Sequence, residues 1–228
     1  MRNLNAKTLY SFTTGDFRAL WDSVAANQVV GSRGNFTFSL LAMLLLELAS
    51  RAADGRPGVL ANLAHELEQR DPRYFTRLPF SAPPRKSFTL PAGAGSPREH
   101  QLLFVLFDLI RNGQAHQAQQ IVVDLGGGAT FFVALSGPSS GQTLSSLSAH
   151  RGTSKHLSAY CGRLHTGITL SPGLLFLDLE AAIDAARVFD GSRRFPYFTR
   201  PSPMGGVSPK HYIATPSAIR NALRQAGH

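Results

Sequence analysis

The sequence contains one cysteine, Cys161, among 228 residues. A single cysteine excludes a disulfide framework within the chain and a zinc site built from several cysteines. It also fits a reducing compartment, so we expect a cytoplasmic protein. Residues 1–12 lack the apolar core of a signal peptide. The apolar segment 36–48 spans about 13 residues, too few to cross a bilayer, and Glu47 interrupts it. We therefore expect no membrane partner.

Charged residues are also scarce, and the acidic ones are the scarcer kind. Fourteen aspartates and glutamates stand against 23 lysines and arginines, which gives a formal net charge of +9. Lysine occurs only at positions 7, 86, 155 and 210, so arginine carries most of the positive charge. Because guanidinium groups bind phosphate in a bidentate manner, this balance favours a nucleic-acid partner. The alternative is a basic protein from a high-GC genome, in which arginine replaces lysine.

Apolar periodicity predicts helices in the first half of the chain. A helix over 17–30 would begin after cap candidates at Thr13–Asp16, and further helices are expected over 36–53 and 59–70. The stretch 99–120 opens with apolar residues at the spacing of one helical face: Leu102, Leu103, Leu106, Leu109 and Ile110. We interpret residues 1–120 as a helical bundle.

The second half of the chain reads as a small sheet with two helices. Two β-rich runs, 121–125 and 130–135, flank Gly126–Gly128 and predict a hairpin. The serine-rich stretch 136–154 is expected to be a loop, and strands are expected over 160–170 and 174–177.

Cap signals predict the two helices of this half. Asp178 would cap a helix that runs to Val188, and Thr215–Pro216 would start a helix that Gly227 ends. The predicted fold class is therefore α+β, an N-terminal helical bundle followed by a small, mostly antiparallel sheet with two helices. Residues 121–228 are expected to pack on the bundle as one unit.

Two proline-rich segments, 71–97 and 191–209, mix basic and aromatic residues. We predict that their cations bind nucleic-acid phosphates: Arg73, Arg77, Arg85, Lys86, Arg193, Arg194 and Arg200. The aromatics between the first set, Tyr74, Phe75, Phe80 and Phe88, either stack on bases or pin the loop to the core. Tyr160 is a further candidate for a binding surface.

Residues able to do phosphate chemistry follow the apolar face of the 99–120 stretch. Asn112 and His116 are four residues apart, so they share a helical face and can form a hydrogen bond. Arg111 and His116 are separated by about 140° on an ideal helix. They can reach one phosphate only in a cleft shared with a neighbouring helix or a second subunit, or if Gly113 loosens the turn. Otherwise Arg111 caps the helix end and His116 is a satisfied core histidine.

The segment LIRNGQAHQ resembles the signature of HEPN-domain ribonucleases, which have arginine, a polar residue, three further residues and histidine late in a helical bundle. The resemblance covers residues 15–120. It implies metal-independent RNA cleavage without a cofactor, in which Arg111 holds the scissile phosphate, His116 is the acid or base and Asn112 orients either group. It also implies a homodimer, and a defence or toxin role with an antitoxin or other regulatory partner.

Two alternatives remain beside this interpretation. The protein could bind nucleic acid or another protein without catalysis, with the motif serving as a helix end or dimer contact. Asp124–Gly128 is similar to the phosphate-binding hairpin of actin-like and sugar-kinase ATPases, which implies phosphate held by backbone amides and magnesium held through water. A glycine-rich hairpin turn explains the same residues.

Overall fold

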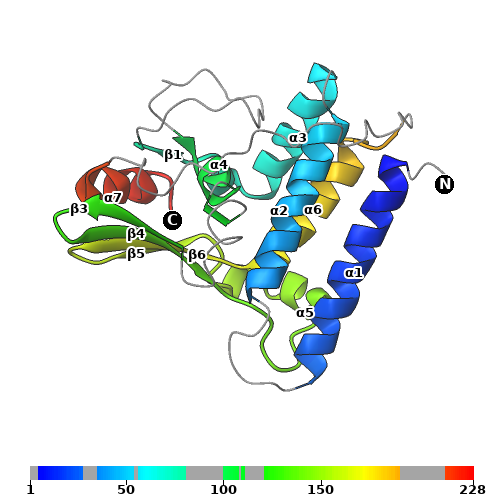
Figure 1. Cartoon of the computed structure of the whole chain (residues 1–228), viewed down its shortest axis with the longest axis horizontal. Helices are drawn as coiled ribbons and strands as arrows, with labels where there is room; N and C mark the ends of the chain where they lie inside the picture. Colours follow the sequence, from blue (N-terminus) through cyan, green and yellow to red (C-terminus); the bar gives the residue numbers. More distant parts are fainter. Residues whose placement is uncertain are drawn as a thin grey trace.

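The computed structural model describes residues 5–27, 35–53, 56–80, 100–107, 109–110, 121–190 and 214–228. Its architecture is α+β, which confirms the predicted fold class. Figure 1 shows the long helices α1 (Ala6–Ala26), α2 (Asn35–Ala52), α3 (Pro57–Arg70) and α6 (Pro172–Ala185) beside a four-stranded sheet.

Helix α1 begins eleven residues before its predicted start. The side chain of Asn5 caps it by accepting a hydrogen bond from the backbone N–H of Thr8, at 2.8 Å. Thr13 and Thr14 lie inside the helix, where their hydroxyls donate to the carbonyls of Leu9 and Tyr10. The predicted cap was wrong because threonine can satisfy its hydroxyl within a helix as well as at its N-terminus.

Helix α2 lies at the centre of the helical half and confirms the segment predicted over 36–53. It packs against α1 and α6, and the predicted pair of Glu47 and Arg51 forms with an N···O distance of 2.7 Å. Among the described helices, α2 alone is long and apolar enough to cross a membrane, and half of it is buried inside the protein.

Helix α6 corrects two predictions. Residues 174–177, expected as a strand, lie inside it, and the cap is Ser171, whose Oγ accepts from the N–H of Leu174. Asp178 is a buried residue of the same helix, so it caps nothing. The short run Leu174–Leu177 is apolar in every position, and a buried helix and a buried strand cannot be distinguished by such a run.

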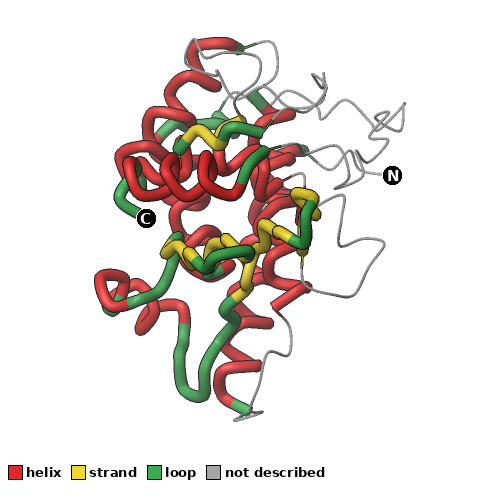
Figure 2. Tube along the Cα trace, turned by 90° about the vertical axis from the view of Figure 1, so that its left-hand side faces the viewer, coloured by secondary structure: helices red, strands yellow, loops and turns green. Residues whose placement is uncertain are grey.

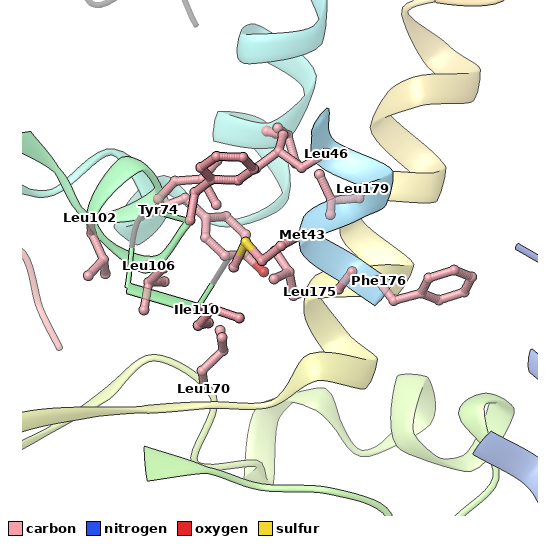
Figure 3. Packing of buried hydrophobic residues seen from close by; sticks show 14 of the residues in the cluster. Met43, Leu46, Tyr74, Leu102, Leu106, Ile110, Leu170, Leu175, Phe176 and Leu179 are labelled. Carbon is pink, nitrogen blue, oxygen red and sulfur yellow. The ribbon is translucent and has the colours of Figure 1, made fainter. Parts of the chain in front are cut away.

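The predicted apolar helix of the 99–120 stretch is α4 (Leu102–Phe107), which is short. It follows β2 (His100–Gln101), which pairs antiparallel with β1 (Arg77–Leu78). The five residues of the predicted apolar face are all buried, three of them in α4 and the other two, Leu109 and Ile110, after its end. Figure 3 shows Leu106 and Ile110 close to Leu170 of the sheet and to side chains of α2 and α6. One cluster of buried residues thus contains side chains from both halves of the chain.

The sheet has the strand order β3-β4-β6-β5. Strands β3 (Ile121–Gly126) and β4 (Ala129–Leu135) form the predicted hairpin. The expected strand 160–170 is in fact a second antiparallel pair, β5 (Ser158–Cys161) and β6 (His165–Leu170). Strand β6 pairs in parallel with β4, so two of the three pairings are antiparallel.

The connection from β4 to β5 contains a helix where a loop was expected. Thr143 caps α5 (Leu144–Ala149), and Leu144 and Leu147 bury their side chains in the core. A 3-10 turn follows at Arg151–Thr153. The serine-rich composition hid two leucines at helical spacing, and these leucines make the connection part of the fold.

Helix α7 (Pro216–Gln225) confirms its predicted caps. The Thr215 side chain accepts from the N–H of Ala218, Pro216 occupies the first turn, and Gly227 has a φ of +74° after the helix end. Ile219 and Leu223 are buried, and α7 contacts β4, β5 and β6. Figures 1 and 2 show α7 on one side of the sheet, and no described helix lies directly below the other side in Figure 1.

Candidate nucleic-acid interface

The predicted catalytic residues Arg111, Asn112 and His116 lie outside the described part of the chain. The same is true of five predicted phosphate-binding residues, Arg85, Lys86, Arg193, Arg194 and Arg200. All of these stay predictions. The structure places Arg73 and Arg77, and it shows a further surface on the sheet.

Arg73 is committed to an ion pair within its own turn. Its Nε lies 2.9 Å from Oδ1 of Asp71 and its Nη2 lies 2.7 Å from Oδ2. Burial would raise the pKa of Asp71, but the hydrogen bonds and charge of Arg73 outweigh burial and hold that pKa below its ordinary value. A phosphate would have to compete with Asp71 for this guanidinium. Arg77 is half-buried on β1 and lines a cavity beside α7.

The aromatics next to these arginines serve the core. Tyr74 and Phe80 are fully buried, and Phe80 packs edge-on against Phe131 of β4 with ring centroids 5.4 Å apart. For these two residues the pinning interpretation is confirmed and the base-stacking interpretation is wrong. Phe88 lies outside the described residues.

Tyr74 belongs to a buried polar network that joins three segments. Its Oη lies 2.8 Å from Nε2 of His156 and 2.9 Å from Oδ2 of Asp178 in α6. The other oxygen of Asp178 accepts a hydrogen bond from Arg151. The backbone N–H of Ser171 donates to Nδ1 of His156, so the imidazole carries its proton on Nε2 and donates it to Tyr74. Tyr74 then donates to Asp178.

The network explains how β5 is held in place. Burial lowers the pKa of His156 to about 3, so this imidazole is neutral at physiological pH. Burial also raises the pKa of Asp178, although Arg151 and Tyr74 oppose that effect. His156 lies two residues before β5, so its hydrogen bonds fix the entry of the chain into that strand. The position of Tyr160 on β5 follows from this anchor.

The outer face of the sheet carries a row of apolar side chains. Cα pairing aligns Val122 of β3 with Phe132 of β4, Phe132 with Gly167 of β6, and Gly167 with Tyr160 of β5. Alternation along β4 buries Phe131 and Val133 on the inner face and leaves Phe132 on the outer one. Val122 and Tyr160 are exposed, Tyr160 to 56%. One line of residues therefore crosses all four strands on the exposed side.

The absence of a side chain at Gly167 leaves room for two aromatic rings to lie side by side. A Cβ built at this glycine would lie 2.7 Å from three ring carbons of Phe132, so the phenyl ring lies directly over the glycine. The Phe132 and Tyr160 rings are 5.6 Å apart with an interplanar angle of 52°. Because both rings lie on the same exposed face, we name Phe132 and Tyr160 the aromatic platform.

Two polar residues lie beside the aromatic platform, and the segments that form the sheet and α7 are rich in basic residues. On the next row, Thr130 Oγ1 and Nδ1 of the exposed His165 are 2.9 Å apart. Residues 121–170 and 214–228 contain one acidic residue, Asp124, and five basic residues: Arg151, Lys155, Arg163, Arg220 and Arg224. Of these, Arg151 pairs with Asp178, and Arg220 donates to the carbonyls of Gly162 and Arg163. These two segments therefore carry more positive than negative formal charge.

The glycine turn beside the platform has a local explanation. Gly126, Gly127 and Gly128 all have positive φ values, between +61° and +84°, which side-chain-bearing residues rarely adopt. Oδ1 of Asp124 accepts from the N–H of Gly126 at 2.8 Å. A hairpin turn alone explains these φ values and this hydrogen bond. They give no separate support to the resemblance to a phosphate-binding hairpin.

The sequence predicted part of this surface. Tyr160 was a candidate for a binding surface, and the alternation in 130–135 indicates that Phe131 and Phe132 face opposite sides. The neighbour of Phe132, however, is set by the parallel pairing of β4 with β6 across 35 residues of sequence. No local pattern reveals that pairing.

Comparisons of the chain with protein-family models, with curated proteins and with solved structures found no match.

Proposed function

We propose that this protein binds single-stranded nucleic acid, primarily RNA, on the outer face of its sheet. The observation that carries the proposal is the aromatic platform, two rings held 5.6 Å apart on an exposed sheet face. Bases of single strands stack on aromatic side chains of this kind, and such stacking contributes about 1–3 kcal/mol per base.

The surroundings of the platform support this proposal. Phosphates would meet Lys155 and Arg163, which flank β5 and are exposed. Thr130 and His165 offer hydrogen-bonding groups for base edges or ribose 2′-hydroxyls on the neighbouring row. Stacking and phosphate contact together give binding with modest sequence preference.

A structural explanation of the same pair must be tested beside it. Aromatic neighbours across strands stabilise sheets by about 0.2–1 kcal/mol without binding anything. The two explanations differ in what a substitution changes. Loss of a ligand contact lowers affinity in a folded protein, whereas loss of a sheet contact lowers only the free energy of unfolding.

The experiment measures affinity for a fluorescent single-stranded RNA in Tyr160→Ala and in a matched control, Phe12→Ala. Phe12 is 58% exposed on α1, close to the 56% of Tyr160, and it lies away from the sheet. We expect Tyr160→Ala to weaken binding by about 5–150-fold, the equivalent of one stacked base, with Phe12→Ala unchanged. Equal affinities in the two folded variants would reject the platform as a binding surface.

RNA cleavage by Arg111, Asn112 and His116 is the second candidate function. The observation in its favour is that Leu109 and Ile110, the two residues directly before the motif in the sequence, are both buried. In this proposal a cytoplasmic homodimer in a defence or toxin role brings two motifs together, and a regulatory partner restrains it.

A cleavage assay in EDTA tests this second candidate. We expect His116→Ala to lose about 10²–10⁴-fold of the rate, the usual contribution of a general acid or base, and Arg111→Ala to lose a similar amount. The control is Arg70→Ala, a substitution at the end of α3 outside the motif. Full activity in both motif variants, or activity abolished by EDTA in the wild type, would rule out this mechanism.

A further inference from the structure

Thr76 and His228 form a hydroxyl–imidazole pair outside the surface described above. Thr76 follows the 3-10 helix Pro72–Phe75, and its Oγ1 lies 2.6 Å from Nε2 of His228. The other ring nitrogen, Nδ1, lies 2.7 Å from the carbonyl oxygen of Leu157. A carbonyl oxygen can only accept, so Nδ1 carries the proton of the neutral ring. Nε2 therefore presents its lone pair to Thr76, and the threonine hydroxyl donates to it.

The carbonyl that orients this imidazole belongs to an unusual residue. Leu157 is fully buried and has a φ of +54°, a left-handed conformation that costs free energy for a side-chain-bearing residue. Its N–H donates to the carbonyl of Thr169 at 2.7 Å, and its neighbour His156 is anchored in the buried network. Strand pairing and the network together hold the strained residue in place. The strained conformation directs its carbonyl toward His228.

A cavity of about 520 Å³ opens beside Thr76. One wall is the segment from Phe75 to Pro79, and the other is the face of α7 that carries Asn221 and Gln225. Thr76 is 7% exposed and lines the cavity, whereas His228 is absent from its lining. A ligand in the cavity would therefore contact Thr76 without touching His228.

We propose that Thr76 is the nucleophile of an ester-hydrolysing site and that His228 is its general base. In the first step Oγ1 bonds to the ester carbonyl carbon while its proton moves to Nε2. The carbon–oxygen bond to the alkoxide then breaks, and the alcohol leaves with the proton from Nε2. In the second step water adds to the acyl carbon and gives a proton to Nε2. The bond between that carbon and Oγ1 then breaks as Nε2 returns the proton to Oγ1, which releases the carboxylic acid and restores both Thr76 and His228. No oxidant or metal is needed for this balance.

The lining of the cavity indicates the substrate class. Phe75, Pro79 and Ala222 supply apolar surface for a short acyl chain. Asn221 and Gln225 are four residues apart on α7, so their side-chain amides share one helical face and can donate to the oxyanion that develops on the carbonyl. A neutral carboxylic ester needs only such donors. The imidazole is oriented by a carbonyl and not by a carboxylate, so esters with good leaving groups fit better than amides.

The protonation state of His228 is suited to a general base. Burial lowers the pKa of His228, opposed by its hydrogen bond to Leu157, and the charges of Arg73 and Asp71 lower and raise it respectively. The ring is therefore neutral and ready to accept a proton at neutral pH. No other described titratable group is hydrogen-bonded to its ring.

The test uses the whole chain, p-nitrophenyl acetate as substrate and a fluorophosphonate probe that labels activated hydroxyls. We expect the probe to form an adduct that mass spectrometry locates on Thr76. We expect His228→Gln to lower the hydrolysis rate about 10²–10⁴-fold and to abolish the adduct. Thr76→Ser should keep activity and Thr76→Ala should lose it, while Thr153→Ala, an exposed threonine of the 3-10 turn, should behave as the wild type.

Circular dichroism on each variant separates chemistry from folding. If Thr76→Ala unfolds, the folded Thr76→Ser variant and the probe adduct still decide the question. Wild-type protein that forms no adduct on Thr76, or that hydrolyses the ester no faster than folded His228→Gln, would overturn the proposal. The rate should also rise with pH through the titration of His228, which a purely structural pair would not produce.

Discussion

Phe131 and Phe132 are adjacent in the sequence and lie on opposite faces of the same sheet. Phe131 is fully buried against Phe80, and Phe132 lies over Gly167 on the exposed face beside Tyr160. The inner ring is explained by burial of apolar surface. The outer ring is half-exposed, so burial alone gives a weaker reason for its position. The comparison separates a face that stabilises the fold from a face that is available to a ligand.

The largest expected effect concerns the inner face. Phe131→Ala should lower the free energy of unfolding by about 3–5 kcal/mol, the usual loss for a buried phenylalanine, because it leaves a cavity against Phe80. Phe132→Ala should cost clearly less, because water already reaches that ring. Urea denaturation of both variants measures the difference. Equal losses of unfolding free energy in the two variants would contradict the distinction between the two faces.

The second prediction concerns the anchor behind β5. The pKa of His156 is 6.5 in an unfolded chain and about 3 in the fold, so the unfolded state binds more protons between these values. Stability should therefore fall as the pH drops from about 6.5 toward 3, by up to about 1.4 kcal/mol per pH unit from this residue. The contribution of His156 to stability is retained well above pH 6.5.

Urea denaturation at a series of pH values checks this anchor. His156→Asn should flatten the slope, at a cost in stability at pH 7, because Tyr74 loses the hydrogen bond that His156 donates. His150→Asn is the matched control, since it replaces an exposed imidazole six residues earlier. A slope that is the same in wild type and in folded His156→Asn would contradict the assignment.

The smallest expected effect concerns the outer face of the sheet. Gly167→Ala places a methyl group 2.7 Å from the Phe132 ring, which must move away. We expect a loss of about 1 kcal/mol in stability, at the low end for an overpacked site because the ring can shift toward solvent. RNA affinity should fall, because the distance between the two rings changes. A Gly152→Ala variant, in open space at an exposed turn, provides the control.

The sequence predicted most elements whose ends have strong local signals. Thr215, Pro216 and Gly227 bound α7 as expected, and the glycines of the β3–β4 hairpin are where a turn needs positive φ. Local signals failed where two structures satisfy one pattern. The all-apolar run Leu174–Leu177 fits a buried helix as well as a strand, and tertiary packing against α2 and α3 decides between them.

The candidate sites depend on contacts between distant residues. Phe132 meets Tyr160, and Thr76 meets His228, across 28 and 152 residues of sequence. Nothing near Thr76 in the sequence indicates a catalytic hydroxyl, because its partner lies beyond the last helix. By contrast, Arg111, Asn112 and His116 form a local motif that the sequence could predict, and that motif lies outside the described residues.

Fluorescence of a tryptophan at position 160 tests the central claim most directly. The only natural tryptophan, Trp21, is fully buried in the helical half and is not expected to respond to a ligand on the sheet. In a Tyr160→Trp variant, single-stranded RNA should quench the new indole by stacking, with a saturating curve that gives the same Kd as anisotropy. A Phe12→Trp variant should show no such quenching. An unchanged indole signal at saturating RNA, or equal quenching in the two variants, would contradict the account.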